Sequence, residues 1–268
     1  AADFDLMAME HGKDVLVEKP LALNVRDGER VVDVAERLGR TLLVGHVLEY
    51  HPALRELRRL LNEGVLGRLR YVYSNRLNFG KVRTEENALW SFAPHDIALV
   101  LRIIGADPVS VSCSGQSYLS PGIADVTLTS MSFASEAQAH IFVSWLHPFK
   151  EQRFVVVGDQ QMAVFDDTAP WDQKLVLYPH QVNWAGGSVP VAHRAEGVAI
   201  KLLPCEPLTA ECQDFAKAVE ERSRPLADGA TAVRVLRVLE AAGRSMQNGG
   251  QPVAVTAVGG DSVSVHRT

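Results

Sequence analysis

The chain has 268 residues, of which 47% are apolar and 22% are charged, and its formal net charge is −5 at pH 7. These values are typical of a globular protein with a sizeable core. They do not favour a nucleic-acid partner, because a cluster of arginines between residues 55 and 70 is interspersed with Glu56 and Glu63.

The sequence also excludes the classes of membrane-spanning and metal-binding proteins. No apolar run approaches the roughly 18 residues that a membrane span needs. The three cysteines, Cys113, Cys205 and Cys212, cannot all pair and show no metal-ligand spacing, which favours a reducing cytoplasm. We therefore predict no metal site, no membrane partner and a cytoplasmic location.

The first twelve residues are typical of the last turns of a helix that Gly12 would end, with Phe4, Met7, Ala8 and His11 on one face. This helix has neither a starting methionine nor a cap. We expect the chain to begin inside an element and to be an amino-terminally truncated fragment of a longer protein.

A strand, a helix and a second strand follow with short connections. Val15–Val17 predicts a buried strand, Asn24 caps a helix that ends at Gly39, and residues 41–46 predict a second buried strand. This order is typical of a parallel crossover unit. Two strands alone cannot bury both faces of a sheet, and no Gly-x-Gly-x-x-Gly loop stands between a strand and a helix. We infer that several strands are absent at the amino-terminal side of residues 1–50; if these residues belong to a dinucleotide-binding Rossmann sheet, the loop that holds the pyrophosphate is missing with those strands.

Lys19 stands directly after the first predicted strand. In open α/β sheets, ligands bind at the carboxyl ends of the strands, so Lys19 lies where chemistry is expected. Pro20 fixes the backbone of the turn that follows. The alternative is a strand that simply continues into a surface loop.

From His51 onward the pattern changes. Pro52 opens a helix that ends at Gly64. Strands are predicted at residues 69–79, 109–118, 126–133, 139–145, 154–157, 162–165 and 175–178, a loop at 186–197, and helices at 209–221 and 230–246. Closely spaced strands favour antiparallel pairing. The predicted fold class is therefore α/β: a Rossmann remnant, followed over residues 51–268 by an α+β domain with a large, mostly antiparallel sheet, whose final helix packs back on the first domain.

One helix interrupts these strands and contains His95. The apolar stripe of Ile97, Val100, Leu101 and Ile104 places His95 in the first turn of this helix. Unpaired N–H groups in a first turn disfavour a cation, so we expect the pKa of His95 to be lowered and its imidazole to accept a proton near pH 7. The alternative is a histidine that hydrogen-bonds a neighbouring loop.

Three motifs mark the places where chemistry is expected: Glu18-Lys19-Pro20 after the first strand, Gly45-His46 at the end of the second, and Pro94-His95-Asp96 in the helix. On these motifs the chain resembles the Gfo/Idh/MocA family of NAD(P)-dependent sugar oxidoreductases, from residue 6 to residue 255. The run from residue 75 to residue 96 is similar to the branch that contains UDP-N-acetylglucosamine and UDP-N-acetylglucosaminuronate 3-dehydrogenases.

The resemblance implies hydride transfer between a sugar ring carbon and a nicotinamide. Lys19 and His95 would be catalytic and would share about one proton, since two neighbouring cations repel each other. Glu18, Lys19, Pro20 and His46 would contact the cofactor, which is expected to be NAD, with NADP left open. The expected reaction is oxidation of a ring hydroxyl, at C3, of a UDP-N-acetylhexosamine or its uronate in nucleotide-sugar and surface-polysaccharide biosynthesis.

Candidate substrate-binding residues are Arg76, Lys81, Arg83 and Ser91. A planar guanidinium can bind a carboxylate or a diphosphate with two hydrogen bonds, although these residues could equally form a solvated charged loop. Ser91 occupies the position where many members of the family have an aspartate, which weakens the case for an aspartate-assisted histidine.

Two other functions remain open at this point. One is a dehydrogenase of a free sugar or a polyol such as inositol. The other is a non-catalytic binding or assembly module, in which the open face of the sheet pairs subunits; this open face also predicts a homodimer or homotetramer for the enzyme. Only the enzyme requires Lys19 and His95 to converge. We expect the fragment alone to be inactive.

Overall fold

The computed structural model of the chain describes residues 2–80 and 82–255. Its first elements are α1 (Ala2–Glu10), β1 (Val15–Glu18), α2 (Val25–Leu38) and β2 (Leu42–Gly45). β1 and β2 pair in parallel, with Val17 opposite Val44. The side chain of Asn24 accepts a hydrogen bond from the amide of Asp27, and Gly39 ends α2 in the left-handed conformation. The predicted crossover unit is confirmed.

The remaining elements form a large sheet with helices around it. They are η1 (Val47–Tyr50), α3 (Pro52–Asn62), β3 (Leu69–Phe79), α4 (Ala88–Ile104), β4 (Ser110–Gln116), β5 (Val126–Ser132), β6 (Gln138–Ser144), β7 (Leu146–Gly158), β8 (Met162–Asp166), η2 (Trp171–Gln173), β9 (Leu175–Tyr178), β10 (Gln181–Ala185), β11 (Val189–His193), β12 (Val198–Ala199), α5 (Pro207–Glu221), α6 (Gly229–Gln247) and β13 (Val253–Ala254).

Within the described residues the large sheet has nine strands, in the order β12-β9-β8-β7-β3-β6-β5-β4-β13. Only β3 and β6 pair in parallel; every other neighbouring pair is antiparallel. This confirms the predicted fold class, a short parallel sheet followed by a large, mostly antiparallel one. β7 begins eight residues before the predicted strand at residue 154, because its first half pairs with the distal half of β3.

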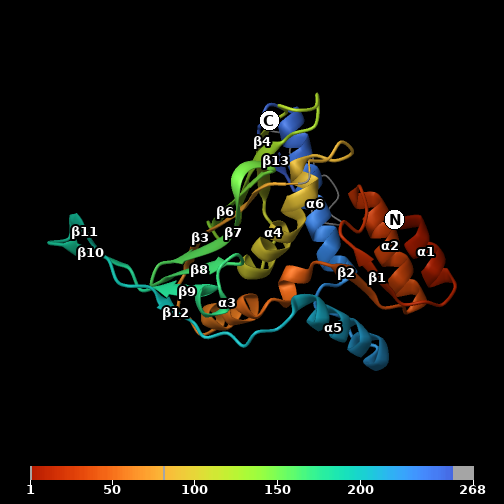
Figure 1. Ribbon diagram of the computed structural model, residues 1–268, viewed down its shortest axis with the longest axis horizontal. Helices are drawn as coiled ribbons and strands as arrows, with labels where there is room; N and C mark the ends of the chain where they lie inside the picture. The colour runs from red at the N-terminus through yellow and green to blue at the C-terminus, as the bar shows by residue number, and fades with distance from the viewer. Residues whose placement is uncertain (1, 81, 256–268) are drawn as a thin grey trace, which may run out of the picture.

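Two helices connect the sheets. α4 lies over the centre of the large sheet, against β3, β5 and β6, while α6 packs against α4 and β4 on one side and α2 on the other (Figure 1). Gly28 of α2 permits this approach, because a Cβ atom there would lie 2.6 Å from Leu236 Cδ1 of α6. One continuous apolar core therefore runs from α1 and β1 through α6 and α4 to the large sheet.

Two local predictions were wrong. In α1 the buried residues are Asp5, Leu6 and Met9, whereas Phe4 and Met7 of the predicted face are 73% and 51% exposed. Residues 189–193, expected to be loop, form the strand β11 and pair with β10. The turn of this hairpin contains Gly186 and Gly187, both with positive φ, and glycine pairs of this kind are a hairpin signal.

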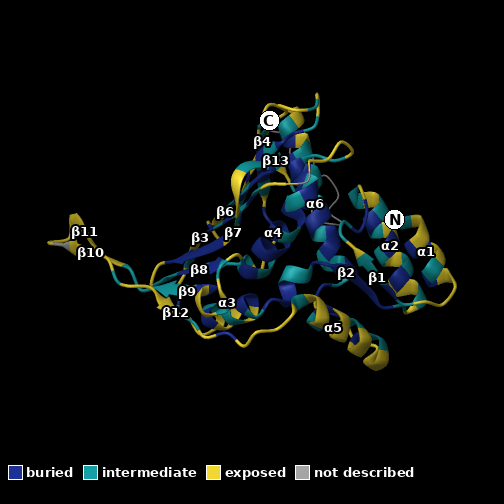
Figure 2. Cartoon of the chain, viewed as in Figure 1, coloured by how far each residue is buried: buried dark blue, intermediate teal, exposed yellow. Residues whose placement is uncertain are grey.

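The hairpin projects from the edge of the large sheet, as Figure 2 shows in yellow. The hairpin is connected to the rest of the chain at its base, between β9 and β12. The side chains of Val182 and Trp184, on one face of the hairpin, are 57% and 63% exposed. In the described ranges no helix is both long and apolar enough to cross a bilayer.

The end of β7 offers a test of the packing. A Cβ atom on Gly158 would lie 1.9 Å from the carbonyl oxygen of Leu66, whereas a Cβ on Gly243 in α6 would meet nothing within 4 Å. We expect Gly158→Ala to lower the free energy of unfolding by about 1–3 kcal/mol through overpacking. The matched control Gly243→Ala should raise the same quantity by up to about 1 kcal/mol, because alanine favours helix. Urea denaturation of both variants is the measurement, and equal stability of Gly158→Ala and wild type would contradict this packing.

Candidate functional site

Lys19 leaves the carboxyl end of β1 and points toward α4. Its Nζ donates a hydrogen bond of 2.7 Å to the main-chain carbonyl of Ser91. Burial lowers the pKa of Lys19, and the charges of Arg83 and Arg76 add to this effect, while the Glu86 and Glu18 carboxylates oppose it. A lysine in such surroundings exchanges its proton more readily than one on an open surface.

His95 does not lie in the first turn of its helix, so that prediction was wrong. The side chain of Asn87 accepts a hydrogen bond from the amide of Trp90 and starts α4 at Ala88, which leaves Pro94 inside the helix. The apolar stripe was assigned correctly, but the start of the helix was placed too late. Pro94 has no N–H and interrupts the helical hydrogen bonds at this turn, close to the carbonyl of Ser91 that binds Lys19.

The low pKa predicted for His95 has a different cause from the one expected. Burial lowers the pKa well below its usual value, and the positive charges of Arg76 and Lys19 lower it further, with a smaller effect from His46. The imidazole is therefore neutral at pH 7, as predicted, but through burial and neighbouring cations rather than through a helix terminus.

His46 follows β2 and meets His95 edge-on, with ring centroids 6.3 Å apart and an interplanar angle of 88°. Burial, followed by the charges of Lys19 and Arg102, lowers the pKa of His46 to about 4. Within the described residues, Nδ1 of His46 and Nδ1 of His95 have no hydrogen-bond partner. The structure thus brings Lys19, His46 and His95 together, as the enzyme hypothesis requires; their chemical roles stay predictions.

Arg76 of β3 lies beside this group but is engaged within the protein. Its Nε donates to Asp96 Oδ2 at 2.6 Å and its Nη2 to Asp96 Oδ1 at 3.2 Å. Asp96 is the residue after His95 and is buried. A guanidinium held in this way is poorly placed to turn toward a substrate, so substrate binding by Arg76 stays a prediction without geometric support.

Arg83 lies at the more open end of the site. It pairs with Glu86 at 2.9 Å and, together with Leu23, Val82, Thr84 and Glu85, these two residues line a hollow of about 450 Å³. The charges of Arg83 and Glu86 both act on the pKa of Lys19, in opposite directions. Lys81, the fourth predicted substrate ligand, lies outside the described residues. The roles of Arg83 and Ser91 stay predictions.

The sequence analysis missed two buried carboxyl groups on the other side of β1 and β2. Glu49 of η1 accepts a hydrogen bond from Arg102 Nε at 2.6 Å. Glu211 of α5 is 1% exposed, and one of its oxygens has no partner among the described residues. Burial, helped by the Glu18 and Glu49 carboxylates, raises the pKa of Glu211 to about 7. Glu211 and Ala218 lie on the same buried face of α5. A glutamate on that face was the signal available in the sequence.

A lysine ammonium beside a neutral imidazole can act on an alcohol. The imidazole can accept the hydroxyl proton, and the ammonium can stabilise the alkoxide that develops. Among the described residues, Nδ1 of His46 after β2 and Nδ1 of His95 on α4 have no partner, which leaves two polar atoms for a bound molecule. In the described ranges no group of three metal-binding side chains is assembled.

Comparison with known proteins gives two family matches. Residues 2–46 match the model of the oxidoreductase family with an NAD-binding Rossmann fold, and residues 54–164 match the model of the GFO/IDH/MocA C-terminal domain.

Relatives of this chain act on nucleotide sugars and on polyols. A UDP-N-acetylglucosamine 3-dehydrogenase from Acidithiobacillus ferrooxidans is 26% identical over 86% of this chain and 70% of its own length. Its crystal structure superposes with a TM-score of 0.79 over 92% of this chain and 75% of that one. A scyllo-inositol 2-dehydrogenase (NAD(+)) from Bacillus subtilis is 24% identical over 92% of this chain and 72% of its own length. An inositol dehydrogenase homolog from Azotobacter vinelandii, solved with NADH and myo-inositol, shares the fold, with a TM-score of 0.79 over 94% of this chain and 74% of that one at 20% identity.

The burial of Glu211 predicts a pH effect on stability. Because its pKa is about 7 in the folded chain and 4.5 in its ordinary state, the folded chain holds this proton more tightly. The resulting stabilisation is complete below pH 4.5 and is lost as the pH rises through 7. We expect Glu211→Gln to be more stable than wild type at pH 8 by roughly 1–3 kcal/mol, and to gain little at pH 5.

Urea denaturation at the two pH values measures this difference. Glu220→Gln, on the exposed side of the same helix, is the matched control and should behave like wild type at both. A Glu211→Gln variant with the same pH dependence as wild type would show that the carboxyl group is ionised in the fold.

Proposed function

Because this chain belongs to the Gfo/Idh/MocA family of NAD-binding oxidoreductases, we propose that it oxidises a ring hydroxyl, at C3, of a UDP-N-acetylhexosamine or of its uronate. The observation that carries the proposal is the meeting of Lys19 and His95: the ammonium binds α4 one helical turn before the imidazole, and its charge acts on that ring. A non-catalytic binding module would not require Lys19 and His95 to converge.

The residues present suit a nicotinamide cofactor. Glu18, Lys19 and Pro20 at the end of β1 and His46 at the end of β2 would hold it, since His46 keeps a buried nitrogen without a partner. NAD, when bound, accepts the hydride from the ring carbon.

Lys19 and His95 then act on the substrate hydroxyl group as its proton is removed. The neutral imidazole of His95 can accept it, and the ammonium of Lys19 stabilises the negative charge on the oxygen. Since the cations around His95 lower its pKa, the proton rests on Lys19 in the resting site.

The choice of a nucleotide sugar is supported by the relative from Acidithiobacillus and by the hollow at Arg83. The guanidinium of Arg83 lies in the wall of this hollow and could bind a diphosphate or a carboxylate if it were released from its ion pair with Glu86. A second candidate is a polyol dehydrogenase, which the scyllo-inositol 2-dehydrogenase supports through a match over nearly the whole chain.

The first test replaces Lys19. In the protein expressed from its complete reading frame, UDP-N-acetylglucosamine or its uronate should reduce NAD, and Lys19→Met should lower kcat by about 10²- to 10⁴-fold, as expected for loss of an acid–base group. The exposed Lys13 provides the control Lys13→Met, which should be unchanged. Normal turnover by Lys19→Met would remove the catalytic assignment, and reduction of NAD by inositol but not by UDP-sugars would select the polyol candidate.

We also propose that the sheet face opposite α4 pairs two copies of this chain into a homodimer or, by repetition, a homotetramer. On that face Tyr73 stacks on His140 with centroids 5.2 Å apart, and Tyr71 and Leu128 are 40% and 44% exposed. Exposed aromatic and aliphatic side chains on a broad sheet are typical of a subunit interface.

A charge on this face should separate the copies. We expect Leu128→Arg to elute as a monomer in size-exclusion chromatography with light scattering, because a buried unpaired arginine opposes association. The same substitution at Leu203, which is 79% exposed on a distant loop, should leave the oligomer intact. A wild-type protein that is monomeric at micromolar concentration would contradict the interface.

A further inference from the structure

We propose that the Asp96–Arg76 ion pair is a positioning device, which holds the guanidinium of Arg76 as a permanent positive charge facing His95. The inference rests on the proposed function, because it concerns the candidate catalytic imidazole. It assigns Arg76 and Asp96 a role in controlling a proton rather than in binding the sugar.

The pair is held inside the protein. Asp96 is 1% exposed, and both of its carboxylate oxygens accept hydrogen bonds from Arg76. Asp96 Oδ1 also accepts one from Ser74 Oγ at 2.6 Å. A carboxylate with three donors and a buried location fixes its arginine in one orientation.

The third nitrogen of the guanidinium is also occupied. In the amide orientation that satisfies both of its neighbours, Gln152 of β7 accepts from Arg76 Nη1 at 3.0 Å and donates to Asp167 Oδ2 at 3.1 Å. The network therefore continues from α4 through β3 and β7 to the connection after β8.

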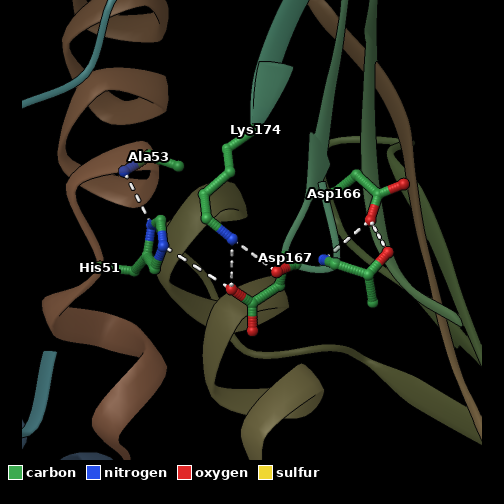
Figure 3. Close-up of polar contacts among 6 residues, drawn as sticks. His51, Ala53, Asp166, Asp167 and Lys174 are labelled. Atoms are coloured by element: carbon green, nitrogen blue, oxygen red, sulfur yellow. Dashed lines mark hydrogen bonds and ion pairs between the residues drawn. The ribbon is translucent and has the colours of Figure 1, made fainter. Parts of the chain in front are cut away.

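Asp167 is anchored in turn, as Figure 3 shows. Lys174 Nζ donates to the main-chain oxygen of Asp167 at 2.5 Å and lies 3.4 Å from its Oδ1, while His51 Nε2 lies 3.7 Å from the same Oδ1. Nδ1 of His51 accepts from the amide of Ala53 and so caps α3. Each nitrogen of the Arg76 guanidinium thus donates one hydrogen bond to a partner within the protein, which fixes the plane and the position of the group.

The fixed charge decides where the shared proton rests. The groups that face His95 are Arg76 from β3, Lys19 after β1 and His46 after β2, and Arg76 is the strongest of these in lowering the pKa of His95. Lys19 can lose its proton, whereas arginine stays charged at every accessible pH. Arg76 therefore keeps a positive charge beside His95 whether or not Lys19 is protonated, which disfavours a proton on the imidazole of the resting site.

Two single variants, which remove opposite charges and should have opposite effects on the pKa of His95, test the electrostatic role. Arg76→Gln leaves the Asp96 carboxylate beside His95 without its counter-charge, and we expect the pKa of His95, followed by NMR of the histidine ring in substrate-free protein, to rise by about 1–3 units. Asp96→Asn leaves the guanidinium alone, and His95 should stay neutral to the lowest pH at which the protein remains folded. A purely structural disturbance would expose the ring and raise its pKa in both variants.

Three further variants guard against misfolding and unrelated charge effects. Arg76→Lys keeps the charge and should retain the wild-type titration, and the double variant Arg76→Gln/Asp96→Asn should fall between the two single variants. Arg153→Gln removes the same charge from the exposed side of β7, where it pairs with Asp166, and should not move the titration of His95.

An unchanged pKa in Arg76→Gln, or a rise in both single variants, would overturn the inference. The pH–rate profile of NAD reduction is recorded on the same variants and separates this result from the proposed function. If the titration of His95 shifts in Arg76→Gln while the profile stays fixed, the ion pair acts as inferred, but His95 is not the acid–base group.

Discussion

The hydrogen bond from Lys19 to the carbonyl of Ser91 is the contact on which the arrangement of the site depends. It connects the carboxyl end of a two-stranded parallel sheet to a helix that lies on the large antiparallel sheet. Pro94 has no N–H to donate to the carbonyl of Trp90, so the helical bonding is interrupted one residue before the Ser91 carbonyl that binds the lysine. The lysine is thereby held within reach of His95 without an acidic partner in direct contact.

The electrostatic character of the site follows from this lack of a direct counter-ion. Lys19 and Arg76 act on two buried imidazoles, and the Asp96 carboxylate is engaged by Arg76 and Ser74. Such a site favours neutral histidines and stabilises negative charge on a bound oxygen. Oxidation of an alcohol creates this kind of charge, which links the sequence motifs to the activity of the family.

The parts predicted from sequence were those encoded locally. The strand, helix and strand of residues 15–45 follow from apolar runs, a capping asparagine and a terminal glycine, and each was found in place. The start of α4 was missed because Asn87 lies seven residues before the proline that was taken as the first residue. The surroundings of His95 could not be predicted, since Arg76 and Asp96 are brought together by packing of α4 on β3. Glu211 meets Glu18 and Glu49 across more than 160 residues of chain, which no local pattern encodes.

The sharing of α6 between the two sheets limits how the molecule can move. Because Leu236 sits against Gly28 on one side while the same helix packs on α4 and β4 on the other, rotation of one sheet about the other would force interdigitated side chains apart. A hinge opening between the halves is therefore costly, and only small sliding displacements of α2 along α6 are compatible with this packing. The packing of α6 on both sides therefore holds the two sheets in one mutual orientation, so that Lys19 after β1 and His95 on α4 belong to one rigid frame.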